Sequence, residues 1–486
     1  MPAQSRTTGA IALTVAQGVV LVLGYVTHLL IGRLLGPASY GVYGVILSIQ
    51  TIVGILLAQG IPVAISRFVA QDEKHAPNIL RQGLKWQIII ALLISGATIL
   101  LAPLLSRLLN DTSLTNLIRF SGFVVFTQAG YPIYVQFLSG LHRFSRQAAL
   151  TITYAVTKLA GAMALLFTFA VYGALGGFAV GGILATVVGW RWARPPRSYP
   201  WPAYRLSLQK FLSFAGTYVL ILVGLQILTS LDLFMVKAIL RDDVQAGYYN
   251  AAVTLARIPF FLLQGLAFVI LPSVSALTKP GASHQTAVNF ITKTLRYLIA
   301  LIVPGATLAA ATSRELTHLF YSSQYLSAAP YLTVLMIGLG ALSFYLLLAN
   351  IVAGAGRAKV ALGITMILLV ISGLLGYFLI PAFGPLGAAW QTTITSLIGL
   401  CILAVYTFRA FRIPIPWRAT INIIIATAVA VSLTYLWSPS VFTLPLIYLL
   451  VGVVYLAMLT LLGEVKPADR QLISRLHPKL KWLAPS

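Results

Sequence analysis

The sequence predicts an all-α, polytopic membrane protein of about 14 transmembrane helices, and two observations support this class. Of the 486 residues, 59% are hydrophobic and only 9% are charged, whereas soluble proteins carry roughly 25% charged residues. So little polar surface could not cover a soluble fold, which excludes a cytosolic enzyme, a disordered chain and a secreted disulfide scaffold. The single cysteine, Cys401, also excludes an internal disulfide.

The second observation is that the apolar residues form long runs between charged or Pro/Gly-rich breaks, each near the roughly 20 residues that one crossing needs. The first run is longer than the apolar core of a signal peptide and lacks a cleavage pattern, so we expect it to be retained. The expected spans are 10–32, 40–70, 84–106, 117–141, 148–170, 173–191, 211–238, 246–277, 294–312, 328–353, 360–381, 386–408, 419–437 and 442–463.

The distribution of charge gives the orientation of these spans. The chain has 33 Lys and Arg against 9 Asp and Glu, a net charge of +24. With the N-terminus inside, 25 basic residues fall on the cytoplasmic side and six on the outer side, while Lys158 and Arg257 lie within spans. The positive-inside rule produces this asymmetry, so we expect both termini in the cytoplasm. The basic residues then reflect topology and contact with anionic lipid, and we expect no nucleic acid partner.

The chain also repeats itself at a distance of roughly 205–214 residues. Residues 39–43 match 245–249, 60–62 match 270–272, 139–143 match 353–357, and 172–177 match 383–388. Each repeat holds six helices, so both copies enter the membrane in the same sense, related by an axis along the membrane normal with a central cavity between them. The predicted organisation is an N-lobe at 1–190, a basic cytoplasmic linker at 191–210, a C-lobe at 211–412, two added helices at 413–463 and a basic cytoplasmic tail at 464–486.

At the turns of this repeat the sequence is similar to a known family. Residues 32–43, Gly-Arg-Leu-Leu-Gly-Pro-Ala-Ser-Tyr-Gly-Val-Tyr, resemble the helix 1–2 turn of bacterial and archaeal oligosaccharide flippases, and 354–389 resemble the same family. This is the Wzx-like polysaccharide transporter family of the multidrug/oligosaccharidyl-lipid/polysaccharide (MOP) exporter superfamily. The resemblance extends from about residue 5 to 412.

The resemblance implies a transporter, not an enzyme, in the cytoplasmic membrane of a prokaryote. Its substrate would be polyprenyl-(pyro)phosphate-linked oligosaccharide, moved to the outer leaflet by alternating access for cell-surface polysaccharide biosynthesis. The partners implied are this substrate, membrane lipids, and the polysaccharide polymerase and glycosyltransferases of the same pathway.

Ionisable residues in the middle of a span are costly and therefore candidate functional residues. Arg257 lies about 11 residues into the 246–277 run and Lys158 about 10 residues into the 148–170 run. Both are predicted to line the cavity and attract phosphate, since a guanidinium suits bidentate phosphate contact. A structural pair of Arg257 with Asp232 is the alternative, and the resemblance implies a cavity-facing basic residue in the helix of Lys158.

Asp232 and His28 occupy equivalent positions, five residues before Lys237 and five before Arg33. They are candidates for ion coupling, because a histidine–carboxylate pair could take up a proton during transport. Structural pairing explains them equally: His28 with a backbone group and Asp232 with Arg257. The uncharged candidates for sugar contacts, or alternatively for hydrogen bonds between helices, are Gln50, Asn250 and Gln226, with Gln17, Gln59 and Gln264.

No catalytic residue, cofactor or metal site is expected. The pair Asp242 and Asp243 opens a helix, where carboxylates cap free N–H groups. The series Gly173, Gly177 and Gly181 predicts close helix packing, and the basic tail from 469 to 482 is expected to lie on the membrane surface.

Two other functions remain open. An ion-coupled extruder of organic cations would need acidic residues in its cavity, and a membrane glycosyltransferase or polymerase would need a large outer loop. Asp232 is the only acidic residue within a span, and the outer loops are short.

Overall fold

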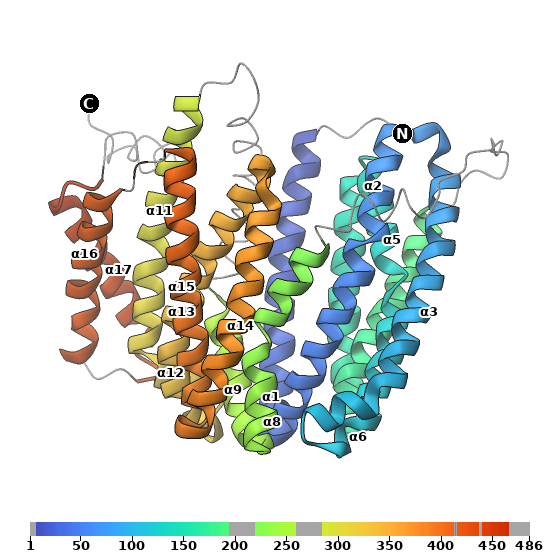
Figure 1. Cartoon of the computed structure of the whole chain (residues 1–486), viewed down its shortest axis with the longest axis horizontal. Coiled ribbons are helices and arrows are strands. Elements are labelled where there is room, and N and C mark those ends of the chain that lie inside the picture. The colour runs from blue at the N-terminus through green and yellow to red at the C-terminus, as the bar shows by residue number, and fades with distance from the viewer. Residues whose placement is uncertain are drawn as a thin grey trace. The chain divides into compact units, whose positions relative to one another are not determined.

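A computed structural model describes residues 6–193, 219–258, 284–412, 414, 416–436 and 440–465 of the chain. Every regular element in these ranges is a helix (Figure 1). Eight helical segments are long and apolar enough to cross a membrane, and a bent pair, Val219–Leu228 with Leu231–Leu240, is a ninth. The predicted class, an all-α polytopic membrane protein, is confirmed.

The segments in the described ranges are long enough for twelve of the about fourteen predicted crossings. Three of the eight segments are 61, 50 and 61 residues long, enough for two crossings each at about 20 residues per crossing. These give eleven crossings in the described ranges, and the bent pair is the twelfth. The predicted run 117–141 forms two shorter helices, α4 (Thr115–Gln128) and α5 (Tyr131–Gly140). The run 246–277 begins with α9 (Asp243–Ala256), and most of its remainder lies outside the described residues.

The chain packs as two compact units. Unit 1 comprises Met1–Ala251 and Thr365–Gln391, and unit 2 comprises Ala252–Ile364 and Thr392–Ser486. The lobe boundaries expected from the repeat stay a prediction, and most of the predicted linker, 194–210, lies outside the described residues. The remaining helices of unit 1 are α1 (Arg6–Gln59), α2 (Ile61–Gln71), α3 (Ala76–Leu108), α6 (Phe144–Ala193) and α8 (Leu231–Leu240).

The helices of unit 2 are α11 (His284–Ala311), α12 (Ser313–Phe320), α13 (Ala329–Val352), α16 (Trp417–Leu436) and α17 (Leu444–Leu461). A π-helical turn at Ala353–Arg357 follows α13. Three helices, α9, α14 (Ala358–Phe383) and α15 (Pro385–Phe411), contribute residues to both units.

Helix ends follow local backbone chemistry. Gly36, with φ of 73°, separates the two halves of α1, and Ala170, with φ of 46°, separates those of α6. Gly36 lies between the predicted runs 10–32 and 40–70, and Ala170 is the last residue of the predicted run 148–170. Glycine adopts this left-handed region freely, whereas an alanine there is strained and must be held by its surroundings.

Besides the bent pair in the run 211–238, two other predicted spans, 40–70 and 117–141, are broken. The first breaks between α1 and α2 at Gly60, and the second between α4 and α5 at Gly130. Each new helix has a proline in its first turn, Pro62 or Pro132. A proline has no N–H to donate back to the preceding turn and disfavours helical geometry in the residue before it. The shared pattern Gly-x-Pro therefore ends one helix and begins another.

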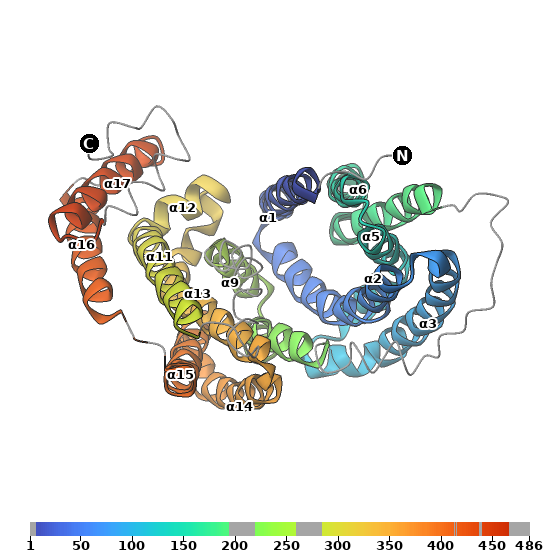
Figure 2. The ribbon, with the colours of Figure 1, turned by 90° about the horizontal axis from the view of Figure 1, so that it is seen from above.

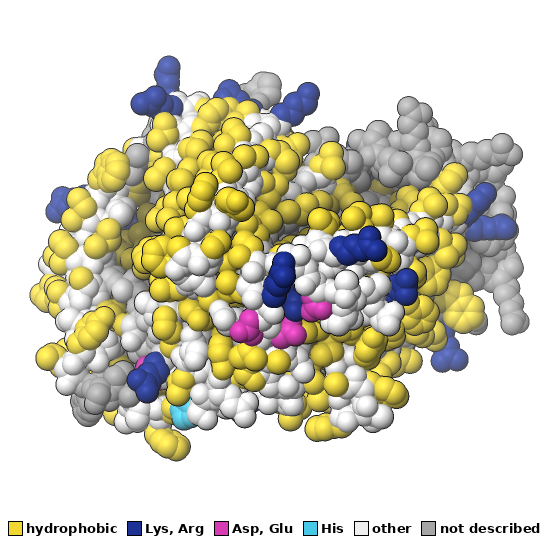
Figure 3. All heavy atoms as spheres, turned by 60° about the horizontal axis from the view of Figure 1, so that its bottom comes forward, with side chains coloured by type: hydrophobic (Ala, Val, Ile, Leu, Met, Phe, Trp, Pro, Cys, Tyr) yellow, Lys and Arg dark blue, Asp and Glu magenta, His cyan; other side chains and the backbone are white. Residues whose placement is uncertain are grey.

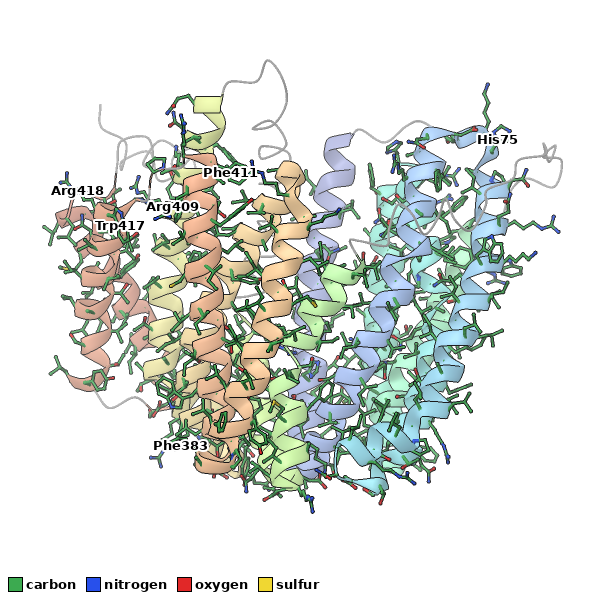
Figure 4. The ribbon with its side chains drawn as sticks, in the orientation of Figure 1. His75, Phe383, Arg409, Phe411, Trp417 and Arg418 are labelled. Atoms are coloured by element: carbon green, nitrogen blue, oxygen red, sulfur yellow. The ribbon has the colours of Figure 1, made fainter. Side chains whose placement is uncertain are left out.

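The broken pieces α2 and α5 form the core of a block at one end of unit 1. They share a cluster of buried residues with the start of α3 and with parts of α6, including Ile65, Ile79, Ile133 and Leu150. Figure 2, a view along the helices, shows α2 and α5 among α1, α3 and α6. We call this block the His75-end block, since α2 and α3 meet beside His75 there (Figure 4).

In unit 2 the two added helices, α16 and α17, pack against each other and against α11. Arg296 of α11 lies 3.3 Å from the Glu464 carboxylate, which also accepts a hydrogen bond from Asn422 of α16 at 2.9 Å. Arg409 near the end of α15 and Arg418 at the start of α16 lie at one end of this unit (Figure 4). The prediction assigned both arginines to the cytoplasmic side.

The predicted glycine series on α6 packs closely, as expected. An added Cβ would lie 2.1 Å from Leu165 O at Gly173, 2.4 Å from Ala162 N at Gly177 and 2.9 Å from Lys158 Cβ at Gly181. No larger residue fits between the two halves of α6 at these positions without a shift of backbone.

Candidate functional site

Unit 1 contains a cavity of about 270 Å³ whose walls come from α1, α4, α5 and α6. On the α1 side, Gly54 borders empty space, because a Cβ added to it would meet no atom within 4 Å. The cavity is lined by Leu47, Gln50, Thr51, Gly54, Ile55, Leu57, Ala58, Val125, Gln128, Tyr131, Pro132, Tyr154 and Phe178. No carboxylate is among these lining residues.

Aromatic rings form one wall of this cavity. Tyr131 of α5 and Tyr154 of α6 stack with their ring centroids 4.2 Å apart and their planes 9° from parallel. The Tyr154 hydroxyl donates a hydrogen bond of 2.8 Å to Gln128 Oε1. The stack therefore joins α4, α5 and α6, and it places an amide beside the rings.

Lys158 lies next to this wall. Its ammonium is 5.0 Å from the ring centroid of Phe178 and 5.8 Å from that of Tyr154, within cation–π range of two cavity residues. In the part of the chain that the structure describes, the ammonium has no hydrogen bond and no ion pair. A half-buried ammonium held only by ring faces is incompletely solvated, so it favours an anion brought by a ligand.

Gln50 is the second polar group that the cavity leaves unsatisfied. Its side chain is 4% exposed, and its Oε1 has no hydrogen-bond partner among the described residues. A buried acceptor without a donor costs roughly 1–3 kcal/mol. A ligand hydroxyl or N–H in the cavity would remove that cost, which fits the prediction that Gln50 contacts sugar.

Two of the other candidate sugar contacts, Asn250 and Gln226, lie outside the cavity lining. Asn250 is buried and donates from Nδ2 to Tyr40 O at 3.2 Å, and it packs on Gly44. Gln226 donates from Nε2 to Ser230 Oγ at 3.0 Å, beside the break before α8. These contacts correspond to the alternative interpretation, hydrogen bonding within and between helices.

Asp232 and His28 each face a buried tyrosine. The Asp232 carboxylate accepts a 2.7 Å hydrogen bond from the Tyr249 hydroxyl, and the His28 ring meets the edge of Tyr43 at 5.9 Å. Tyr43 and Tyr249 are themselves matched positions of the sequence repeat, so equivalent residues have equivalent neighbours. Ion coupling through Asp232 and His28 stays a prediction.

Arg257 lies directly after α9, at the edge of the described residues and in unit 2. Its backbone N–H still donates to Val253 O at 3.0 Å, so the helical path continues to this residue. Its role in binding phosphate and its pairing with Asp232 both stay predictions.

Lys237 is a charged residue whose environment the sequence analysis did not identify. Lys237 is one of the six basic residues expected on the outer side, and it lies near the end of α8 with 2% of its side chain exposed. Its ammonium is 2.6 Å from Asp111 Oδ2 and also binds the Asp243 carboxylate. Asn110 adds a 2.8 Å hydrogen bond to Ala238 O. We call these three charges the Lys237 cluster.

The Lys237 cluster changes the acidity of Asp111, which lies in the turn between α3 and α4. Partial burial of the carboxyl group opposes ionisation, but hydrogen bonds from Lys237 and Ser113 together with the lysine charge outweigh it. The net effect holds the pKa of Asp111 below its usual value. In Figure 3 acidic side chains gather beside basic ones on the face that is at the bottom of Figure 1.

Two further expectations concern the start of α9. Asp242 caps it as predicted, since Oδ1 accepts from Val244 N at 2.8 Å and Gln245 N at 3.2 Å. Asp243 is instead part of the Lys237 cluster.

Two glycines at matched positions of the repeat lie next to each other: a Cβ on Gly41 would lie 2.7 Å from Gly247 N. Within the described residues no group of three His, Cys, Asp or Glu could hold a metal ion.

Comparison with known proteins gives a family and a fold. Residues 7–278, more than half of the chain, match the family described as "Polysaccharide biosynthesis protein". An uncharacterized membrane protein of Methanocaldococcus jannaschii is 28% identical over 193 residues, covering 39% of this chain. The match spans 37% of that relative's length.

Three solved structures of low sequence identity have the same fold. The lipid II flippase MurJ, in an inward closed conformation, has a TM-score of 0.76 and 16% identity over 94% of this chain and 98% of that chain. An inward-facing MATE family transporter of the MOP superfamily has a TM-score of 0.68 and 15% identity, covering 81% and 94%. A MOP superfamily transporter from Pyrococcus furiosus, described by the reverse polarity of its binding pocket, has a TM-score of 0.59 and 14% identity, covering 84% and 97%.

Proposed function

The chain belongs to the polysaccharide biosynthesis protein family, and from this premise we propose that it is a flippase for polyprenyl-(pyro)phosphate-linked oligosaccharide. It moves the sugar-bearing head group from the cytoplasmic to the outer leaflet by alternating access, and catalyses no covalent reaction. The fold it shares with a lipid II flippase and with MATE transporters supports a transport function.

The observation that carries this proposal is the environment of Lys158. The head group of such a substrate is anionic, and moving it through hydrocarbon without a counter-charge is costly. Lys158 offers an ammonium beside a cavity that has no lining carboxylate. Phosphate binds the ammonium in this proposal, and the lipid tail stays in the bilayer.

The sugar is recognised by the uncharged groups of the same cavity. Gln50 supplies an unpaired amide oxygen. The cavity, of about 270 Å³, is large enough for several polar groups of a sugar to enter beside Gln50. Arg257 is proposed as a second phosphate contact, since its planar guanidinium suits bidentate binding.

Orientation and partners complete the proposal. The excess of basic residues in alternate segments supports an orientation with both termini in the cytoplasm. The membrane is then the cytoplasmic membrane of a prokaryote. The partners are membrane lipids together with the glycosyltransferases and the polymerase that make and consume the lipid-linked oligosaccharide.

An extruder of organic cations is less well supported. A cationic substrate would need carboxylates, yet the cavity lining has none and Asp232 already accepts a hydrogen bond from Tyr249. Asp232 and His28 are proposed instead as a proton-coupling pair. Transport in proteoliposomes that does not respond to an imposed pH gradient would remove that role.

The test is transport of a fluorescent polyprenyl pyrophosphate sugar in proteoliposomes, read with an impermeant quencher. Lys158→Ala combined with Arg257→Ala should abolish transport without lowering the amount of folded protein. Transport by the double variant at the wild-type rate would contradict the proposal.

A second test blocks the cavity by size and leaves its charge unchanged. Gly54→Leu adds a side chain where a Cβ has open space in the cavity, whereas Gly452→Leu adds one on α17, where a Cβ also meets nothing within 4 Å. Only Gly54→Leu should reduce transport. Equal rates for the two variants would show that the substrate does not use this cavity.

A further inference from the structure

A single buried glutamine connects the two broken helices that line the cavity. Gln87 of α3 is 2% exposed, and its Nε2 donates to Leu57 O at 2.9 Å and to Ala129 O at 3.0 Å. Leu57 lies in the last turn of α1 and Ala129 directly follows α4. Carbonyls at helix ends lack their usual intrahelical donors, so one amide group here serves two helix ends.

The surroundings of this amide are apolar. Leu57, Ala91, Val125 and Ala129 form a buried cluster around it. Water has little access to this cluster, so the loss of Gln87 would leave two buried carbonyls without a hydrogen-bond donor.

Both breaks border the cavity directly. Leu57 and Ala58 line it from the end of α1, and Gln128, Tyr131 and Pro132 line it from the break between α4 and α5. Helices bend where a glycine and a proline interrupt the hydrogen-bond ladder. The separation of these two breaks therefore sets the shape of the cavity next to the His75-end block.

The pieces beyond the breaks are joined to each other. An added Cβ on Gly140 of α5 would lie 2.7 Å from Ser66 O of α2, and both helices share one buried core. Since α2 and α5 are packed this closely, they move together when either break bends. We call the break between α1 and α2 and the break between α4 and α5 the paired hinge. The Gln87 amide bonds to a carbonyl beside each of the two breaks.

We propose that Gln87 is a positioning residue that fixes the width of the cavity by joining the α1–α2 and α4–α5 breaks across this paired hinge. It touches no substrate itself. Without its two hydrogen bonds, the His75-end block tilts relative to α1 and α4 and the cavity widens. This inference concerns the geometry of the site proposed above, and only its transport arm depends on the proposed function.

The direct test measures distances between spin labels in nanodiscs, on a background in which the single cysteine is removed by Cys401→Ser. One pair, Ala70→Cys on α2 and Phe123→Cys on α4, spans the hinge. A second pair, Ala70→Cys and Arg143→Cys, lies within the His75-end block. All three positions are exposed.

Gln87→Leu should shift and broaden the distance across the hinge and leave the distance within the block unchanged. Ser95→Ala removes a different buried polar group of α3, a hydroxyl with no hydrogen-bond partner among the described residues, and should change neither distance. Unchanged distances across the hinge in Gln87→Leu would overturn the inference. A change in both pairs would also overturn it, because it would indicate general loss of structure.

Transport gives the second readout. For the fluorescent polyprenyl pyrophosphate sugar, Gln87→Leu should raise KM about tenfold, the size expected for a loss near 1.4 kcal/mol, with less change in kcat. A lower yield of folded protein with an unchanged KM would show a merely structural role. If the wild type does not transport this probe, the proposed function fails while the distance test stands.

Discussion

Two lysines of unit 1, both in apolar helices, are held in opposite ways. Lys237 is 2% exposed and binds two carboxylates, Asp111 and Asp243. Lys158 is half-buried and contacts only the faces of two aromatic rings. The fold supplies the counter-charges of the first lysine and none, within the described residues, for the second. The difference supports a structural role for Lys237, and it is the reason for proposing that Lys158 binds an anionic ligand.

The largest expected effect is a difference in stability between variants of these two lysines. Lys237→Met leaves two carboxylates near a desolvated position without their cation, so it should lower the free energy of unfolding by about 1–3 kcal/mol. Lys158→Met removes a charge that has no ion pair and should not lower it. Thermal unfolding of both variants in one detergent measures this, and equal destabilisation would remove the distinction.

A matched triple variant checks the cause. Lys237→Met combined with Asp111→Asn and Asp243→Asn removes all three charges at once. Residues in one network are not additive, so part of the lost stability should return. No recovery would show that packing of the lysine stem, and not charge pairing, stabilises this region.

A smaller effect is expected at Gln50. Gln50→Leu replaces an amide whose buried oxygen has no donor, so the free protein should gain roughly 1 kcal/mol of stability. Binding of the sugar-bearing probe should weaken in the same variant. A loss of stability would contradict this, because it would show that the Gln50 amide makes a stabilising contact in the free protein.

The smallest effect concerns pH. Because the pKa of Asp111 is held below its usual value, its stabilising contribution is fully present above the unfolded pKa of about 3.9 and is lost as pH falls through the lower folded value. The carboxylate is partly exposed, so we expect less than about 1 kcal/mol.

Thermal midpoints measured from pH 7 to pH 3 should show this loss only below about pH 4. Asp111→Asn should lack that component of the acid dependence. If the wild type and the variant lose stability in parallel through acid, the ion pair of Asp111 contributes nothing measurable.

Much of the fold could be predicted from the sequence, because hydropathy and local backbone chemistry are readable along the chain. The turn at Gly36, the Asp242 cap and the close packing of Gly177 all depend on neighbouring residues or on a simple periodicity. The breaks at Gly60 and Gly130 were not predicted, although the Gly-x-Pro pattern at both positions was a sufficient local indication.

The parts of the site that escaped prediction depend on contacts distant in sequence. Lys237 is separated from Asp111 by most of the N-terminal half, so nothing local distinguished it from a loop lysine. Gln87 lies two residues after Lys85, at the start of an apolar run, so nothing local marked it as buried, and its two acceptors belong to other helices. Gln50, Asn250 and Gln226 looked alike in sequence, and only packing placed Gln50 in the cavity lining.

The most direct test of the central claim is the affinity of the protein for a short-chain polyprenyl pyrophosphate in nanodiscs. Measured against wild type, Lys158→Met should weaken the Kd at least tenfold, a loss of about 1.4 kcal/mol, and Lys158→Arg should restore most of it. The folded fraction of Lys237→Met should bind as the wild type does. An unchanged Kd in Lys158→Met would contradict the claim that this ammonium receives the anionic head group.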